Sequence, residues 1–111
     1  MKFTEEDLLL RIFLSETTQI KGLPLYEHIV MKAKELKLAG ATVLRGVMGF
    51  GADSHLHSSK LVDLGVSLPV VIEIVDKEEN IHKILPYLDE TVIDGFMTIE
   101  KVSVIRYRHK L

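Results

Sequence analysis

The stretch Val70-Val71-Ile72-Glu73-Ile74-Val75 decides the fold, because it is apolar and β-branched at almost every position. Such a run predicts a buried strand. A second run, Leu8 to Leu14, is apolar except for Arg11 and has the length of a strand buried on both faces. Side chains alternate between the two faces along a strand, so we expect Arg11 and Glu73 to pair across these strands on one face.

One helix and one strand are expected between these two runs. The helix begins at Pro24, since proline is favoured as a first helical residue, and Gly40 supplies its stop. Residues Ala41 to Met48 follow as a strand. The apolar face of the helix has the spacing of helical turns and consists of Leu25, Ile29, Ala33 and Leu36.

A second helix and a last strand are expected after Val75. Asp76 and Glu79 have the spacing of a capping pair, and Pro86 is expected to kink or end the helix. Phe96 to Tyr107 carries enough β-branched residues for a strand, and its alternation changes phase at Glu100-Lys101, which indicates a bulge there. The apolar face of this helix contains Ile81, Ile84, Leu85 and Leu88.

The order β-α-β-β-α-β is the ferredoxin-like plan, an α+β sandwich with two helices on one face of an antiparallel four-stranded sheet. We expect residues 1–111 to form a single domain, with a long loop over residues 51–68 between strands two and three. The strand runs are apolar on both faces, whereas two helices cover only one. The uncovered face is therefore expected to be buried against other subunits, the alternative being scattered surface residues of a monomer.

Composition excludes several classes of protein. The chain has 111 residues, no Cys, no Trp and a net charge of −2, so it lacks a disulfide framework and a basic surface for nucleic acid. No apolar run reaches the roughly 20 residues of a membrane span, and the N-terminus is acidic, so we expect a cytoplasmic protein without membrane insertion. Neither a Ser-His-acid set nor a carboxylate pair in an apolar setting stands out, which argues against an enzyme.

Three motifs are candidates for binding an anion. Gly49-Phe50-Gly51 opens the long loop, where glycines let backbone N–H groups approach phosphate; the alternative is a mobile hairpin. Arg106 and Arg108 lie two apart on the last strand, so they leave the same face and can converge on one anion, unless they are a solvated strand end. Asp94-Gly95 forms a turn that can present N–H groups.

The order and spacing of these motifs resemble those of the PII nitrogen-regulatory proteins. The resemblance is strongest to a small PII-like family, DUF190, whose members share the Pro-Leu-Tyr-Glu helix start and the Gly-Ala-Thr-Val strand start. It covers nearly the whole chain, from Leu8 to Arg108. The matching segments are Thr42 to Gly46, Gly49-Phe50-Gly51, Leu68-Pro69, Asp94-Gly95 and Val104 to Arg108.

The resemblance implies a homotrimer that binds an adenine nucleotide, ADP, AMP or ATP, in each cleft between subunits and requires no other cofactor. The loop 51–68 would report the ligand to a protein target such as a transporter or an enzyme, by becoming ordered or disordered. Gly40-Ala41-Thr42 would line the base pocket. The site residues that the resemblance implies are Thr42, Gly49, Phe50, Gly51, Asp94, Gly95, Arg106 and Arg108.

Three cations of PII proteins are missing. Those proteins place Arg after Gly-Phe-Gly, Lys after Leu-Pro and Lys after Gly-Asp-Gly, where this chain has Ala52, Val70 and Phe96. Since each charge-assisted bond contributes roughly 1.5 to 3 kcal/mol, the differences argue against tight triphosphate binding. A mono- or diphosphate fits better.

The loop also contains a possible metal site. Asp53, His55 and His57 alternate, so an extended segment would point all three side chains the same way. Carboxylate and imidazole are ligands for zinc or copper. The alternative function is therefore that of a CutA-like trimeric metal-binding protein, which shares this architecture.

Overall fold

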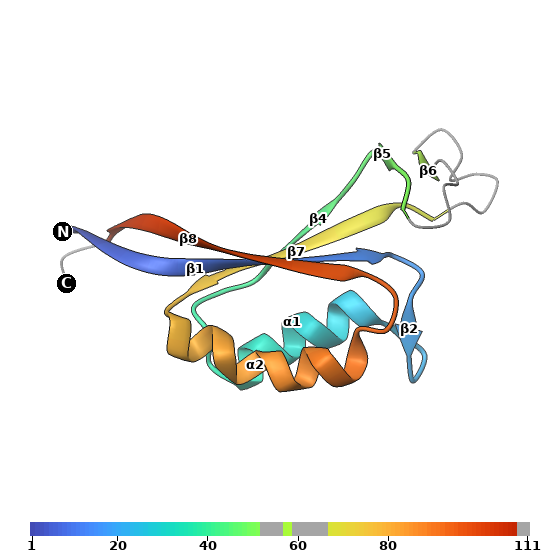
Figure 1. Cartoon of the computed structure of the whole chain (residues 1–111), viewed down its shortest axis with the longest axis horizontal. Coiled ribbons are helices and arrows are strands. Elements are labelled where there is room, and N and C mark those ends of the chain that lie inside the picture. The colour runs from blue at the N-terminus through green and yellow to red at the C-terminus, as the bar shows by residue number, and fades with distance from the viewer. Residues whose placement is uncertain (52–56, 59–66, 109–111) are drawn as a thin grey trace.

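The computed structural model describes residues 1–51, 57–58 and 67–108 of the chain. A four-stranded antiparallel sheet has the order β4-β7-β1-β8, and both helices lie side by side on one of its faces (Figure 1). The predicted α+β fold is confirmed. The sheet contains β1 (Lys2–Ser15), β4 (Thr42–Arg45), β7 (Pro69–Asp76) and β8 (Phe96–Tyr107), and the helices are α1 (Leu25–Glu35) and α2 (Glu78–Thr91).

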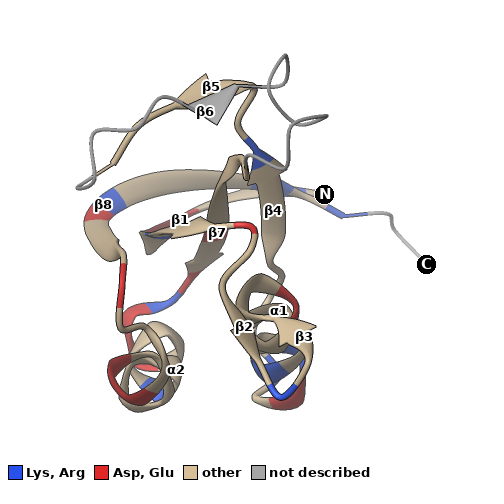
Figure 2. Ribbon diagram, turned by 90° about the vertical axis from the view of Figure 1, so that its right-hand side faces the viewer, with Lys and Arg blue, Asp and Glu red and all other residues tan. Residues whose placement is uncertain are grey.

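Two short hairpins accompany the sheet. β2 (Gln19–Ile20) pairs with β3 (Leu23–Pro24) before α1. β5 (Met48–Gly49) pairs with β6 (His57–Ser58), so the predicted loop contains a hairpin strand. Viewed from the end, the β5–β6 hairpin lies on the side of the sheet opposite to the helices (Figure 2).

The core lies between the sheet and the helices. β1 and β7 are the central strands, and alternate residues of both are buried beneath α1 and α2. Each fully buried aliphatic side chain stabilises the fold by about 1.5 to 3 kcal/mol. The nine largest fully buried side chains are Leu10, Ile12, Leu25, Ile29, Ile72, Ile74, Ile81, Ile84 and Leu88.

The predicted pairing of Arg11 with Glu73 is confirmed. The two residues are opposite each other in the β1–β7 ladder, and Arg11 Nε donates to Glu73 Oε2 at 2.9 Å. Arg11 Nη1 also donates to Glu100 Oε1 on β8 at 2.8 Å. These residues lie on the sheet face that the helices leave uncovered, which we call the open face. It carries Leu9, Arg11 and Phe13 of β1 and the residues that pair with them.

The first helix is shorter than the sequence predicts. Pro24 precedes its first residue, and α1 ends at Glu35, well before Gly40. Lys37 takes a left-handed conformation with φ 62°, and Leu38 N–H donates back to Ala33 O at 3.0 Å. This αL turn ends the helix without a glycine.

The strand predicted over Ala41 to Met48 is divided. β4 ends at Arg45, and Gly46 N–H donates to Pro69 O at 2.8 Å. A Cβ at Gly46 would lie 2.8 Å from Pro69 Cγ, so this close approach requires glycine. The chain then leaves the sheet and pairs as β5 with β6.

Two further local predictions are wrong, and of the two outcomes expected for Pro86, a kink or an end, the second does not occur. The helix α2 continues past Pro86 to Thr91, because one proline removes only one hydrogen-bond donor. Asp76 and Glu79 form no cap, because α2 begins at Glu78 and has no capping side-chain bond. The β1–β8 ladder runs without a bulge past Glu100-Lys101. Both residues are exposed on this edge strand, which explains the polar break in the pattern.

Within residues 1–51, 57–58 and 67–108, neither helix is both long and apolar enough to cross a membrane.

Candidate functional site

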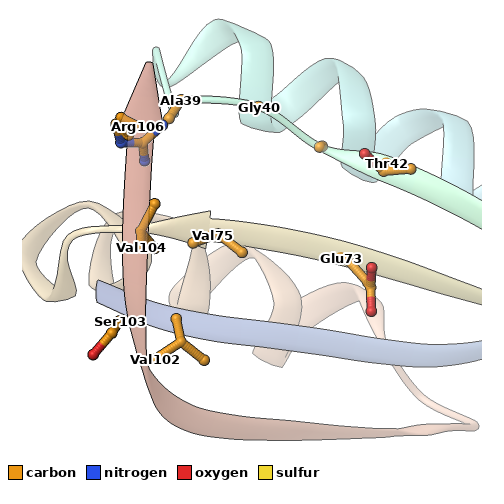
Figure 3. A pocket seen from close by; sticks show the side chains of 10 residues that line it. Ala39, Gly40, Thr42, Glu73, Val75, Val102, Ser103, Val104 and Arg106 are labelled. Carbon is orange, nitrogen blue, oxygen red and sulfur yellow. The ribbon is translucent and has the colours of Figure 1, made fainter. Parts of the chain in front are cut away.

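A pocket of about 490 Å³ lies where the N-terminal half of β1 extends beyond β7 (Figure 3). Residues 2–7 pair only with β8, and this two-stranded ribbon brings Arg106 beside the segment Ala39 to Thr42. β7 contributes Glu73 and Val75 to the wall. We call this the Thr42 pocket; its lining residues are Ala39, Gly40, Ala41, Thr42, Glu73, Val75, Val102, Ser103, Val104 and Arg106.

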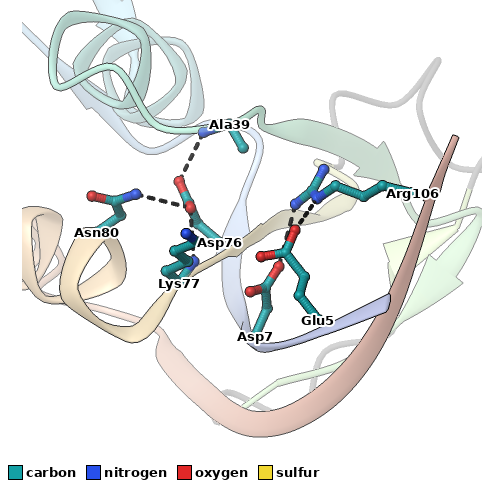
Figure 4. A network of polar contacts seen from close by, with 7 residues as sticks. All are labelled: Glu5, Asp7, Ala39, Asp76, Lys77, Asn80 and Arg106. Atoms are coloured by element: carbon teal, nitrogen blue, oxygen red, sulfur yellow. Dashed lines mark hydrogen bonds and ion pairs between the residues drawn. The ribbon is translucent and has the colours of Figure 1, made fainter. Parts of the chain in front are cut away.

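Arg106 is held by two carboxylates of β1 (Figure 4). Its Nε donates to Glu5 Oε1 at 2.5 Å, and its Nη2 donates to Asp7 Oδ2 at 3.2 Å. The Asp7 side chain is fully buried, and its Oδ1 has no hydrogen-bond partner among the described residues. Burial raises the pKa of Asp7 above its ordinary value, against the hydrogen bond from Arg106, and the nearby Glu5 adds to the rise.

Asp76 fixes the wall that contains Thr42. Its Oδ2 accepts from Ala39 N–H at 2.8 Å, and its Oδ1 accepts from Lys77 N–H at 2.7 Å and Asn80 Nδ2 at 3.0 Å. Burial alone would raise the pKa of Asp76, but these three donors hold it below its ordinary value. The carboxylate therefore joins the start of α2 to the segment that leads into β4.

The loop root, Gly49 to Gly51, lies near the other end of the sheet, where β7 begins. A Cβ at Gly49 would lie 3.3 Å from Pro69 Cγ, whereas no atom of the described residues lies within 4 Å of a Cβ at Gly51. The Phe50 side chain is 72% exposed. Neither glycine takes a positive φ. The root is therefore accessible, and its glycines are not required by backbone conformation.

Glu16 joins the end of β4 to the end of the loop, and the sequence did not reveal this role. It accepts from Arg45 Nε at 2.8 Å and from Leu68 N–H at 2.9 Å, and its own N–H donates to Leu68 O at 3.0 Å. The bond from Arg45, followed by that from Leu68, holds the pKa of Glu16 below its ordinary value. In the sequence Glu16 is one polar residue in a connection, with no marker of its distant partners.

Asp94-Gly95 lies at the same end as the loop root. Gly95 has φ 148°, and a Cβ there would lie 2.5 Å from Phe13 O. This position therefore requires glycine for packing against β1. Asp94 is exposed beside it.

The residues implied for the site fall into two groups within one chain. Thr42 and Arg106 lie together, whereas Gly49 to Gly51 and Asp94-Gly95 lie at the other end. Arg106 is ten residues beyond the start of β8, a distance of about 33 Å along an extended strand. Arg108 belongs with the first group, because its guanidinium lies over the ring of Phe3, 5.1 Å from the centroid.

The alternative metal site, Asp53, His55 and His57, lies largely outside the described residues. Asp53 and His55 are not among them. For His57 the structure gives the backbone pairing with Gly49 alone. No cluster of three or more potential metal ligands occurs among the residues that are described.

Comparison with known proteins identifies the family. Residues 7–104 match the model of DUF190, described as "Uncharacterized ACR, COG1993". The chain belongs to the DUF190 family. It is 43% identical to a UPF0166 protein of Aquifex aeolicus over 87% of this chain and 91% of that protein. It is also 39% identical to a UPF0166 protein of Methanocaldococcus jannaschii over 82% of this chain and 83% of that protein.

Solved structures share the fold of this DUF190 chain. CPII from Thiomonas intermedia, bound to ADP and bicarbonate, has a TM-score of 0.68 at 15% identity, over 92% of this chain and 91% of that one. A candidate PII-like signalling protein from Thermus thermophilus has a TM-score of 0.61 at 20% identity, over 91% of this chain and 90% of that one. The fold is therefore that of PII-like proteins.

Proposed function

We propose that this chain is a cytoplasmic PII-like regulatory protein, without enzymatic activity, that binds an adenine nucleotide between the subunits of a homotrimer. One subunit would supply the Thr42 pocket with Arg106 and Arg108. Its neighbour would supply the loop root and Asp94-Gly95. The CPII structure that shares this fold contains ADP, which supports the choice of ligand.

The separation of the two residue groups is the observation that carries the proposal. Groups about 33 Å apart on one strand cannot contact one small ligand. The two groups can meet when the Arg106 end of one subunit's sheet faces the loop-root end of the neighbouring subunit's sheet. The open face supplies apolar surface for such an assembly, since Leu44 is 49% and Phe96 60% exposed in the single chain.

The Thr42 pocket suits the base of the nucleotide. Its volume of about 490 Å³ lies within the range of small-molecule sites, and Val75, Val102 and Val104 give it apolar walls. The phosphates would extend towards Arg106 and Arg108, whose guanidinium forks match phosphate oxygens. With Ala52, Val70 and Phe96 at the positions of the PII cations, a mono- or diphosphate remains the preferred ligand.

The loop 51–68 would report the bound nucleotide to a protein target. Glu16 attaches Leu68, the last residue of this loop, and Arg45, the last residue of β4, to the end of β1. The base of the loop is therefore held in place. A ligand that contacts Gly49 to Gly51 would change the conformation of the rest of the loop relative to this fixed base. The loop is then a two-state element biased by the ligand.

Calorimetric titration with AMP, ADP, ATP and cyclic AMP, before and after removal of metals, tests the proposal. We expect AMP or ADP to bind with one site per subunit, more tightly than ATP, and removal of metals to leave the affinity unchanged. No nucleotide binding, together with stoichiometric zinc or copper binding, would reject it in favour of the CutA-like function. Sedimentation should show a trimer, and a monomer would contradict the shared site.

A further inference from the structure

Arg106 is not free to meet a ligand, because Glu5 and Asp7 already bind it. The Arg106 side chain is 30% exposed, the Glu5 side chain is 21% exposed and the Asp7 side chain is fully buried. Two carboxylates surround one guanidinium, so the charges of the three groups sum to −1 when both acids are ionised. A phosphate that approaches Arg106 would meet this negative charge and must compete for the same donors.

In this cluster, the ionised state of Asp7 depends most on Arg106. Its Oδ1 is buried without a donor among the described residues, and its only hydrogen bond there comes from Arg106 to Oδ2. A buried carboxylate without donors is costly to keep charged, and the neutral acid is favoured instead. Without Arg106, the remaining influences on Asp7 would be its burial and the nearby Glu5, and both of these favour the protonated form of Asp7.

The other charged groups near this cluster have partners of their own. The charge of Arg106 helps to lower the pKa of Asp76, at the end of β7, but Asp76 is bound by Ala39, Lys77 and Asn80. Glu73, which lines the pocket, is paired with Arg11. Among the described residues, Glu5 and Arg106 are the charged groups that act on Asp7 itself.

We propose that Glu5 and Asp7 hold Arg106 as an internal counter-ion, that an anionic ligand takes Arg106 from them, and that Asp7 then takes up a proton from solvent. This inference rests on the proposed function and adds a requirement for the ligand. The ligand must carry an anion strong enough to replace two carboxylates, such as a phosphate or diphosphate, so a neutral nucleoside would not displace them.

The direction of the pH dependence follows from proton linkage. When Arg106 moves to the ligand, the pKa of Asp7 rises further, because the hydrogen bond that lowers it is lost. At a pH between the pKa of Asp7 in the free protein and its pKa in the complex, the complex holds more protons than the free protein. In that window the affinity for the anion increases as the pH falls, by at most tenfold per pH unit for one proton.

Calorimetry with ADP in steps from pH 4 to 8, in buffers of different ionisation enthalpy, tests the inference. The wild-type chain should take up protons on binding and lose affinity as the pH rises. Asp7→Asn keeps the shape but cannot take up the proton, so its affinity should vary less with pH and its proton uptake should fall. Glu5→Gln, the matched control, removes a competing charge and should bind ADP more tightly while it still takes up a proton, over a window moved to lower pH because Glu5 no longer raises the pKa of Asp7. Circular dichroism checks that both variants fold.

Carbon NMR of the Asp7 carboxyl in the free protein supplies a readout without ligand. Arg106→Ala should raise the pKa of Asp7, and an unchanged titration would overturn the inference. ADP binding with the same proton uptake in the wild-type chain and in Asp7→Asn would also overturn it while the proposed function stands. Failure to bind ADP from pH 4 to 8 would reject both.

Discussion

Phe13 stacks on Phe96 on the open face, with ring centroids 4.4 Å apart and planes inclined by 12°. The two residues are opposite each other in the β1–β8 ladder. Phe96 is nevertheless 60% exposed in the single chain. A stacked aromatic ring that remains this exposed, on a face without helices that also carries Leu44, is the kind of surface that subunit contact buries.

Phe96→Asp should therefore weaken the trimer. A charge placed in an apolar interface must lose its hydration without gaining a partner, so the sedimentation coefficient should shift towards that of a monomer. Ile93→Asp is the matched control, because Ile93 is 87% exposed in the connection between α2 and β8 and lies outside the sheet. An oligomer unaffected by the first change would remove the open face from the interface.

Gly95→Ala should destabilise the fold by about 1 to 3 kcal/mol, the usual cost of a strained backbone position. The new Cβ would meet Phe13 O at 2.5 Å, and φ is 148°. Urea denaturation measures the change. Gly40→Ala is the control, because no atom lies within 4 Å of its Cβ position and its φ is not positive. Equal stability of the two variants would show that the close approach to β1 is not real.

Glu16→Ala should loosen the loop without unfolding the sheet. The Leu68 amide, whose N–H donates to Glu16 Oε1, should exchange with solvent about three- to tenfold faster. The Leu10 amide, in the central strand, is the internal control. Unchanged exchange at Leu68 would mean that Glu16 does not hold the end of the loop.

The hydrogen bond from the Leu68 amide to Glu16 predicts how the loop responds to pH. The pKa of Glu16 is lower in the folded chain than in the unfolded one. Its stabilising contribution is therefore fully present above the unfolded pKa and is lost as the pH falls through the folded pKa. Exchange at Leu68, corrected for intrinsic rates, should accelerate below about pH 4 in the wild-type chain. In Glu16→Ala this acceleration should be absent; its persistence would assign it to another group.

Arg106→Ala should weaken ADP binding by about tenfold or more, since a charge-assisted bond to phosphate is lost. Arg11→Ala is the control, because Arg11 lies on the same face but binds Glu73 and Glu100 instead of lining the pocket. Calorimetry and sedimentation on both variants separate ligand contact from loss of assembly. Equal affinities of Arg106→Ala and the wild-type chain would exclude Arg106 from the site.

The sequence predicts the sheet well because its central strands have clear local patterns. β1 and β7 are apolar on both faces, and their alternation places Arg11 opposite Glu73. The prediction is weaker where one long-range contact decides the local structure. β4 ends at Arg45 because Pro69 lies against the next residue, Gly46, and the pattern of residues 41–48 alone does not reveal this contact.

The candidate site is predicted in its residue types but not in its pairings. Arg106 stands out in the sequence as a cation for an anionic ligand. Its pairing with Glu5 and Asp7 depends on the register of the β1–β8 ladder, which joins the two ends of the chain. Glu16 likewise acquires its role from partners 29 and 52 residues away.

Mixed trimers test the shared site most directly. Arg106→Ala damages the pocket half, and Gly51→Asp places a negative charge at the loop root, where none of the described residues has an atom within 4 Å of the new Cβ. Neither variant alone should bind ADP well. If the halves come from different subunits, unfolding and refolding an equal mixture should restore roughly a quarter of the sites, those with both intact halves. No recovery of binding in mixed trimers would contradict the account.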